Sequence, residues 1–460
     1  MPAELIGSIV LILVLIFSGI GLPFCFLTGC IVYAVTSGSS MGTFIQTSFA
    51  ALNSYSIIAM PMFMMAGTFI DESGIARTLI DAAEKILGRI KGGMAATIPL
   101  VACFFGALSG SGTATVTTLA SMMVPRLNQI GYEKRYLAAL VAAAGPLGYM
   151  IPPNVNALIF NRVSTASVSG LFLATIIPGL IWCVGFFIII RLQYQKYYHP
   201  PVAGVSEADA LRELEIVDTL GVEGAPADPA NPLVETKKKG MWHGLVPAIM
   251  MPVIIMGGIY GGVFSATEAG AVGCLYCMLI GVLWFKKFTF RQAIKHFNTS
   301  AKSVGTIMIL MPMTFIFSRI LVINGIPAML TQIIMDVSGG NKIIILLMVD
   351  LILFIAGFFV DCNVLQLVFV PLLLPLMKTI GVAETHLAVI MFVAIGVGTI
   401  TPPMAMNIFI AGRIIDIPTT DIIKPIWPFV FGLGVPMMLI VTFLPELSLW
   451  LPRLILGTVQ

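Results

Sequence analysis

The sequence contains few charged residues. Asp, Glu, Lys and Arg together make up 10% of its 460 residues, whereas hydrophobic residues make up 58% and the mean hydropathy is +1.00. A chain of this composition lacks the polar surface that would cover a water-soluble globule. We therefore expect an integral membrane protein in contact with the lipid bilayer.

Histidine is also scarce, and the seven cysteines lie in apolar segments. Cys274 and Cys277 have the spacing of a metal or redox motif, but no histidine lies near them, so apolar packing is their expected role. The sequence contains no phosphate-binding loop and no nucleophile beside a base. Transition-metal chemistry and catalysis are therefore not indicated, and nor is nucleic-acid binding.

The apolar runs are of the helical type and recur as far as Leu447. Each is about 20 residues long, which is enough to cross a hydrocarbon core, and none alternates like a strand of a membrane barrel. The first run lacks a basic start and a cleavage site, so it is interpreted as a retained helix. An all-α polytopic protein is predicted, with simple helices near residues 4–20, 22–37, 48–70, 168–190, 244–262, 267–285, 303–323 and 426–444.

One half of the chain repeats the other at an offset of 250 or 251 residues. Met60-Pro61-Met62 recurs as Met311-Pro312-Met313, Gly106 as Gly357, and Pro152-Pro153 as Pro402-Pro403. The repeated elements are those that interrupt helices. Paired interrupted helices in two halves of a membrane protein indicate a transport site near the middle of the membrane.

The repeat divides the chain into two units and a linker. Residues 1–198 contain an arm (75–91), a hairpin (94–125) and a broken helix (136–162). Residues 244–450 contain an arm (326–342), a hairpin (343–377) and a broken helix (385–411). Residues 199–243, rich in Pro, Ala, Asp and Glu, are predicted to be a cytoplasmic linker without a transport role.

Charge and length define how these elements are expected to lie in the membrane. The first arm has four basic residues and the second has one, which predicts that they lie on opposite faces and that the repeat is inverted. Each leg of the first hairpin is about 13 to 15 residues, or about 20 Å, too short for a core of about 30 Å, so a re-entrant hairpin is expected. If Gly21-Leu22-Pro23 bends one helix instead of joining two, the N-terminus is cytoplasmic.

The candidate binding elements are the hairpin tips, at 109–113 and 357–363, and the helix breaks, at 145–154 and 396–403. Backbone groups that leave helical geometry in a bilayer need other partners, and carbonyl and hydroxyl oxygens suit Na⁺. The predicted Na⁺ ligands are Ser109, Gly110, Ser111, Gly112, Gly145, Gly148, Pro152, Gly357, Asp361, Gly396, Thr399 and Thr401. The predicted substrate-binding residues are Ser111, Thr113, Asn154, Asn363 and Pro403.

Each of these assignments has a structural alternative. The Ser-Gly and Pro-Pro motifs can be kinks packed by small residues. Asp361 can be a helix cap facing water, although a carboxylate at membrane depth indicates a functional site. Arg162 and Arg319 are expected to extend to the membrane interface, which leaves backbone N–H groups and hydroxyls to hold a substrate carboxylate.

At these residues the chain resembles the large membrane subunit of the tripartite ATP-independent periplasmic (TRAP) transporters, the DctM-like family. The resemblance is carried by Met60-Pro-Met-Phe-Met-Met-Ala-Gly67, Gly106-Ala-Leu-Ser-Gly-Ser111, Ile151-Pro-Pro153, Gly262-Val-Phe-Ser-Ala-Thr-Glu-Ala269, Gly357-Phe-Phe-Val-Asp361 and Thr401-Pro-Pro403. It implies an elevator-type transporter in a bacterial inner membrane, coupled to Na⁺. It also implies a small four-helix membrane subunit and a periplasmic binding protein that delivers an organic acid, such as a dicarboxylate or a sialic acid.

The sequence departs from this pattern after Pro153, where Asn154 and Asn156 stand in place of the expected small residues. We expect a Na⁺-coupled importer of a small organic acid. One alternative is a stand-alone ion-coupled carboxylate transporter of similar architecture. A channel would need a continuous polar stripe and an intramembrane enzyme would need a catalytic pair, and the sequence suggests neither.

Overall fold

The computed structural model describes residues 2–53, 55–200, 207 and 241–457. The described part is helical throughout, apart from an isolated bridge between Tyr132 and Tyr198, which confirms the all-α prediction. The first half contains α1 (Ala3–Phe17), α2 (Leu22–Ser37), α3 (Met41–Leu52), α4 (Tyr55–Ser73), α5 (Ile75–Leu87), α6 (Gly93–Ser109), α7 (Gly112–Gln129), α8 (Lys134–Ala144), α9 (Leu147–Met150), α10 (Val155–Val163) and α11 (Val168–Tyr197).

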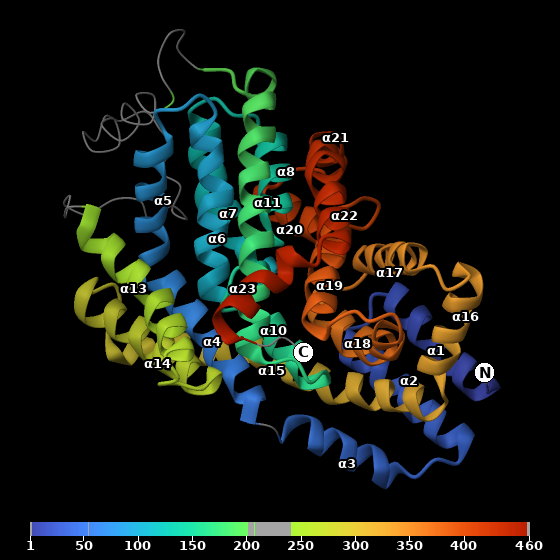
Figure 1. Cartoon of the computed structure of the whole chain (residues 1–460). Helices are drawn as coiled ribbons and strands as arrows, with labels where there is room; N and C mark the ends of the chain where they lie inside the picture. The colour runs from blue at the N-terminus through green and yellow to red at the C-terminus, as the bar shows by residue number, and fades with distance from the viewer. Residues whose placement is uncertain (1, 54, 201–206, 208–240, 458–460) are drawn as a thin grey trace.

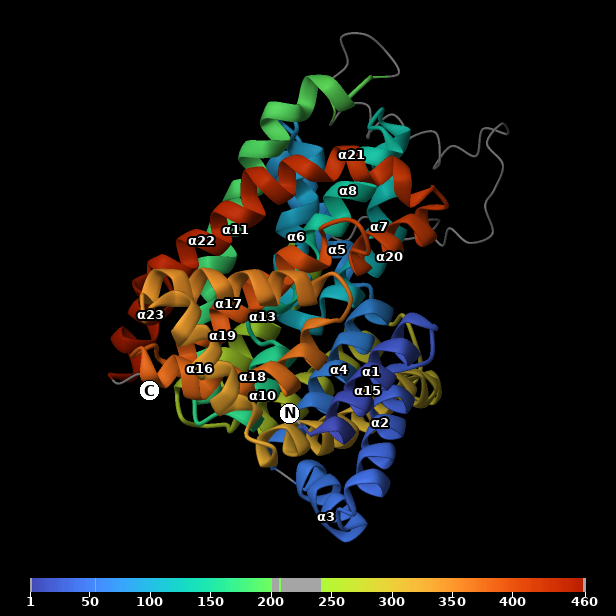
Figure 2. The same ribbon diagram turned by 90° about the vertical axis from the view of Figure 1, so that its right-hand side faces the viewer.

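The second half contains α13 (Met241–Tyr260), α14 (Ala266–Leu279), η1 (Ile280–Trp284), α15 (Phe290–Ile323), α16 (Ile326–Ser338), α17 (Lys342–Gly357), α18 (Cys362–Thr379), α19 (Glu384–Thr399), α20 (Met406–Ile415), α21 (Thr419–Phe429), η2 (Val430–Gly434), α22 (Val435–Phe443) and α23 (Glu446–Leu456). Figure 1 shows α6, α7, α8 and α11 at the centre, between α13 and α14 on one side and α16, α17 and α18 on the other. Helix α3 lies at the lower edge in Figures 1 and 2.

Two predicted segments differ from the structure. The helix expected at 48–70 is instead the pair α3 and α4, bent by 54° after Asn53, a residue whose side chain competes with helical hydrogen bonding. The helix expected near 303–323 begins earlier, as α15 at Phe290, behind a capping box formed by Thr289 and Gln292.

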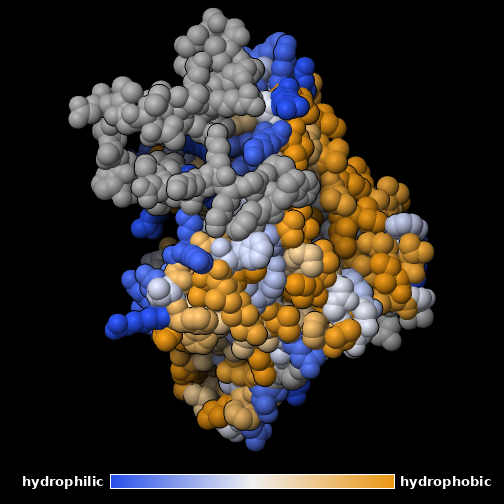
Figure 3. Space-filling model, turned by 90° about the vertical axis from the view of Figure 1, so that its left-hand side faces the viewer, coloured by the Kyte–Doolittle hydropathy of each residue, from blue (hydrophilic) through white to orange (hydrophobic). Residues whose placement is uncertain are grey.

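The described part contains five helices that are long and apolar enough to cross a membrane, or up to seven if each bent pair is one span. One of the five is α18, a leg of the second hairpin. The legs of the first hairpin, α6 and α7, have 17 and 18 residues and are longer than the expected length of about 13 to 15. Large hydrophobic side chains are exposed on the outer helices, such as Val35 (73%), Phe49 (71%) and Leu192 (79%). Figure 3 shows hydrophobic residues over much of one face, as expected for a surface in lipid.

The two broken helices contribute the most deeply buried segments. All residues of α19 are buried, and so is every residue of α8 from Tyr136 to Ala144. Helix α8 is rich in alanine, and small side chains allow neighbouring helices to approach closely within a membrane. The rest of the molecule is therefore built around the helices that were predicted to carry the site.

Glu207 of the linker is bound to the first hairpin. Its carboxylate accepts hydrogen bonds from the backbone N–H groups of Gly92 (2.7 Å) and Met94 (3.1 Å), at the start of α6, and from the Tyr132 hydroxyl (2.9 Å). Glu207 is only 4% exposed. Burial, together with the neighbouring Glu207 carboxylate, raises the pKa of Tyr132, which keeps its hydroxyl protonated as a donor. Glu207 of the linker thus places a negative charge at the N-terminus of α6, where the helix dipole favours an anion.

Replacing this carboxylate should destabilise the protein. Glu207→Ala leaves two N–H groups and a buried hydroxyl without their acceptor, so the apparent melting temperature in detergent should fall by about 5 °C. Glu207→Gln, which keeps one acceptor oxygen, should lie between the wild type and the alanine variant. The matched control is Glu4→Ala, because Glu4 is exposed. Equal melting temperatures for Glu207→Ala and the control would contradict the assignment.

Candidate transport site

The first hairpin tip is a two-residue turn between α6 and α7. Gly110 takes a left-handed conformation (φ 63°), which favours glycine, and Ser111 caps α7 by accepting from the Ala114 N–H (3.4 Å). The Ser111 and Thr113 hydroxyls lie 3.2 Å apart. Ser111 and Thr113, both predicted ligands, thus lie together at the N-terminus of α7.

The second tip has the same design with different side chains. Asp361 caps α18, and its Oδ2 atom accepts from the Asn363 backbone N–H (3.2 Å) and the Asn363 Nδ2 atom (2.6 Å). Asp361 follows Ser111 by 250 residues, and Asn363 follows Thr113 by the same interval. Asp361 is therefore a helix cap, as one of the two interpretations expected, and it brings a negative charge to the position where the first tip has a hydroxyl.

The two helix breaks differ in extent. The first runs from Gly145 to Asn154, where the Asn154 Oδ1 atom caps α10 by accepting from the Ala157 N–H (2.8 Å). The second was expected to begin at Gly396, but α19 continues to Thr399, so the break begins at Ile400. Gly396, Gly398 and Thr399 are thus helical; the glycines serve close packing instead of a turn. Pro152 and Pro403 lie within the breaks, in two cis Pro-Pro pairs.

In each half, the end of the first hairpin helix packs against the broken helix through a pair of glycines. A Cβ atom added to Gly106 would lie 2.5 Å from the Leu147 carbonyl oxygen and 2.8 Å from the Gly148 Cα atom. A Cβ atom added to Gly357 would lie 2.7 Å from the Ile395 carbonyl oxygen and 3.1 Å from the Gly398 Cα atom. The distances to the two carbonyl oxygens are too short for a Cβ atom, so the hairpin and the broken helix are in backbone contact in both halves.

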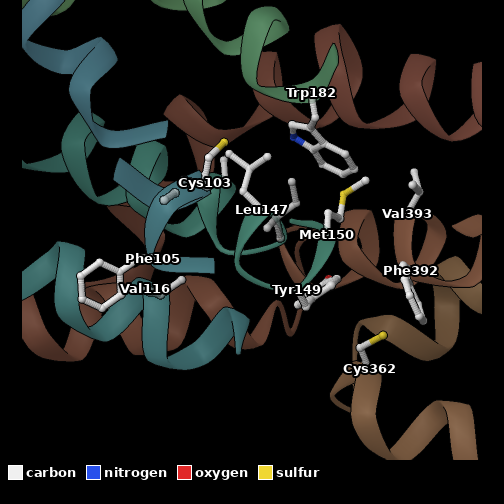
Figure 4. Packing of buried hydrophobic residues seen from close by; sticks show 14 of the residues in the cluster. Cys103, Phe105, Val116, Leu147, Tyr149, Met150, Trp182, Cys362, Phe392 and Val393 are labelled. Atoms are coloured by element: carbon white, nitrogen blue, oxygen red, sulfur yellow. The ribbon is translucent and has the colours of Figure 1, made fainter. Parts of the chain in front are cut away.

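The first break also contacts the second broken helix. Gly396 lies against the Tyr149 hydroxyl and Pro146, and Gly145 lies against the Asn407 side chain. The Asn407 Nδ2 atom donates to the Ala142 carbonyl oxygen and the Thr399 hydroxyl, both at 3.4 Å. Figure 4 shows Tyr149 between ribbons of the two halves, in the same region as Phe392 and Cys362. The structure therefore brings the first break and α19 together.

A buried amide cluster lies between α10 and α18. The Gln366 Nε2 atom donates to the Asn156 Oδ1 atom (2.9 Å), and both residues are at most 1% exposed. Within the described part of the chain, the Asn154 Nδ2, Asn363 Oδ1 and Gln366 Oε1 atoms are buried without a hydrogen-bond partner. Buried polar atoms need partners, so these three atoms require water or a ligand to complete their hydrogen bonding.

Gln366 was not predicted as a site residue. The available signal was its position as a buried amide in the apolar segment of α18, because polar side chains inside membrane helices often mark function. Its partner Asn156 was noted only as a departure from the expected small residues. Their contact joins positions 210 residues apart, which the repeat offset does not reveal.

The oxygen atoms that could hold Na⁺ are partly engaged with the backbone. The Thr399 hydroxyl donates to the Gly396 carbonyl oxygen (2.8 Å), and the Thr401 hydroxyl donates to the Val397 carbonyl oxygen (2.6 Å). A hydroxyl that donates its proton keeps lone pairs for a cation. Gly110, Gly112 and Gly148 lie in the same region, where Gly148 packs against the Ser111 carbonyl oxygen. The assignment of these residues, with Ser109, as Na⁺ ligands stays a prediction.

The arginines lie away from the tips. Arg162, at the end of α10, donates from Nη2 to the Ala50 carbonyl oxygen (2.7 Å), and its guanidinium lies 5.4 Å from the centre of the Phe315 ring. Arg319 is exposed. Arg126 pairs with Asp81 (3.3 Å) and Glu84 (3.0 Å), which joins α7 to α5. Arg162 and Arg126 thus have structural partners outside the candidate site.

The helical fold, the apolar surface and the paired tips define a multi-spanning membrane protein with the architecture of a transporter. A crystal structure of the Alcanivorax borkumensis YdaH transporter has a similar fold, with a TM-score of 0.59 over 89% of this chain and 88% of that one. Sequence identity in this comparison is 12%, so the likeness concerns the fold alone.

The chain belongs to the DctM component family of the tripartite ATP-independent periplasmic transporters, whose family model matches residues 8–447. This confirms the resemblance seen in the sequence. The chain is 29% identical to the C4-dicarboxylate TRAP transporter large permease protein DctM of Pseudomonas aeruginosa, over 93% of both chains. It is 31% identical to the isethionate TRAP transporter permease protein DctMQ of Oleidesulfovibrio alaskensis, over 88% of this chain but 59% of that longer protein.

The glycine contacts predict a sharp difference between two alanine substitutions. Gly398→Ala places a methyl group against the Phe354 carbonyl oxygen and the Gly357 backbone, which should cost about 1 to 3 kcal/mol and reduce uptake by about tenfold or more. Gly257→Ala is the matched control, because this helical glycine has no atom within 4 Å of its added Cβ. The control should be neutral or slightly stabilising. Wild-type uptake by Gly398→Ala would contradict the close packing.

Proposed function

We propose that this chain is the large membrane subunit of a Na⁺-coupled importer of small organic acids in a bacterial inner membrane. It works with a small four-helix membrane subunit and with a periplasmic binding protein that delivers the substrate. The observation that carries the proposal is the matched pair of tips and breaks, together with membership of the DctM family. The hairpins and broken helices would move together as one elevator domain, since their backbones are in contact.

The two tips would have different tasks. Asp361 gives the second tip a negative charge, which favours a cation, whereas Ser111, Thr113 and Asn154 give the first tip only neutral polar groups. An added Cβ atom on Gly110 would lie 2.8 Å from the Val155 backbone nitrogen, so the turn before α7 packs on the start of α10. Two helix N-termini in one place favour an anion. We therefore assign the acid group of the substrate to this place and Na⁺ to both tips.

The substrates named for the relatives fit this assignment of the acid group to the first tip and its surroundings. A C4-dicarboxylate carries two carboxylates, and isethionate carries a sulfonate and a hydroxyl group. An organic acid with a second polar group could use the unpartnered amide atoms of Asn154, Asn363 and Gln366. A stand-alone ion-coupled transporter of similar architecture is the alternative. Uptake into proteoliposomes that hold the chain alone, compared with vesicles that also hold the two partners, separates the two.

Removing the charge of Asp361 should weaken the response to Na⁺. Asp361→Asn keeps a good helix cap but loses the carboxylate, so the Na⁺ concentration for half-maximal uptake should rise by about tenfold, equivalent to about 1.4 kcal/mol. The measurement is initial uptake against Na⁺ concentration in the reconstituted complex. Asp336→Asn, at an exposed acid of α16, is the control. An unchanged Na⁺ curve for Asp361→Asn would remove this residue from the site.

The inverted repeat can be tested by labelling. Lys85 in α5 and Asp336 in α16 are both exposed and lie 251 residues apart, so they are equivalent positions of the two arms. The seven native cysteines are buried, which gives a low background. In intact cells, an impermeant maleimide should label Asp336→Cys from the periplasm, whereas Lys85→Cys should react only after the membrane is opened. Labelling of both from one side would exclude an inverted repeat.

A further inference from the structure

Asp350 is a buried carboxylate outside the tips and breaks. It lies in the middle of α17, is 1% exposed, and accepts one hydrogen bond at Oδ1, from the Thr442 hydroxyl of α22 (3.1 Å). Its Oδ2 atom is buried and has no hydrogen-bond partner among the described residues. None of the described basic side chains lies within ion-pair distance of Asp350.

The titratable groups on the elements around α17 are engaged elsewhere or exposed. Lys378 of α18 pairs with Glu384 of α19 at 2.9 Å. His386 of α19 is buried, and its Nε2 atom lies 2.9 Å from the Val441 carbonyl oxygen, next to Thr442 in the chain. Helix α18 also carries Asp361, which caps it, and the buried thiol Cys362.

Two further groups complete the surroundings of Asp350. Asp336 of α16 and Lys342 at the start of α17 are both exposed. Helix α22 has no titratable residue. Helices α16, α18, α19 and α22 all pack against α17, so these groups are the ones on the elements that contact the helix of Asp350.

A charged carboxylate in this place would be costly. An ion inside a membrane protein needs a counter-ion or several hydrogen bonds, and one hydroxyl donor meets only a small part of that need. A proton removes the charge and leaves the Thr442 contact intact. Na⁺ fits less well, because a cation needs several oxygen atoms to replace its hydration shell and the only side-chain oxygen bonded to Asp350 is that of Thr442.

We propose that Asp350 is a proton-binding site, protonated while α17 packs against α22 and deprotonated when that contact opens. The site would add a proton-linked step to uptake, separate from the Na⁺ sites at the tips. Asp350 and the neighbouring His386 both contact the turn of α22 that contains Val441 and Thr442. Movement of the second hairpin relative to α22 would therefore expose or bury the proton site.

The test is the pH dependence of uptake by the reconstituted complex at saturating Na⁺, from about pH 5 to about pH 9, the range in which perturbed carboxyls titrate. Wild-type uptake should fall by about fivefold or more as pH rises, because deprotonation leaves an unpaired buried charge. Asp350→Asn, an uncharged match to the protonated form, should remove this fall. Asp336→Asn, at the exposed acid, should retain the wild-type profile.

Thr442→Val gives a second variant that stays informative if Asp350→Asn does not fold. The Thr442 hydroxyl donates to the charged carboxylate, so its loss disfavours the deprotonated form and the fall in uptake should move to higher pH. A wild-type profile without a fall, or the same fall in folded Asp350→Asn, would overturn the proposal. A large rise in the Na⁺ requirement of Asp350→Asn at acidic pH would instead make it a cation site, which also overturns it.

This test is independent of the proposed Na⁺ coupling. If the tips do not bind Na⁺, the uptake of every variant will be insensitive to Na⁺ at all pH values. If only the proton site is absent, Na⁺ dependence will persist and the pH profiles of the wild type and Asp350→Asn will coincide.

Discussion

The arrangement depends on one constraint, that backbone N–H and C=O groups inside a bilayer must find partners within the protein. Each interruption in this chain leaves such groups exposed, and each is covered in the same manner. The end of a hairpin helix packs on the broken helix of the same half, and glycines at 106, 148, 357 and 398 allow the two backbones to touch. The polar groups of a tip and a break are thereby concentrated in one place, where they can satisfy each other or a ligand. Binding capacity and structural integrity thus come from the same contacts.

The sequence repeat made much of the arrangement of hairpins and broken helices predictable. Because Gly106 lies 42 residues before Gly148 and Gly357 lies 41 residues before Gly398, the sequence alone indicated which hairpin belongs to which broken helix. The helix ends at Ser109 and Gly357 lie where the tips were expected. The start of the second break was not predictable from composition. Glycine in a helical pattern can end a helix or admit a close neighbour, and at Gly396 and Gly398 only the packing of Tyr149 and Gly357 against α19 decides.

Contacts between the halves were beyond the sequence for a different reason. The Gln366 bond to Asn156 and the Asn407 bond to Ala142 join residues that are not equivalent under the repeat. A pattern within one sequence reports periodicity and spacing, whereas these pairs depend on how two units dock. The same holds for Glu207, since neither its linker composition nor its neighbours in the chain indicate that it would cap α6. Contacts of this kind can be identified only from the three-dimensional structure.

The carboxylates of this protein differ in how many hydrogen-bond partners they have. Glu207 and Asp361 each accept more than one hydrogen bond, and Glu384 accepts from a backbone N–H and pairs with Lys378. Asp350 alone among these four has a single hydrogen-bond donor. That donor belongs to a different element, the α22 helix, and not to the helix that carries Asp350. A group whose charge state depends on one movable contact links protonation to conformation, because opening the contact admits water to a carboxylate that was neutral while it was closed.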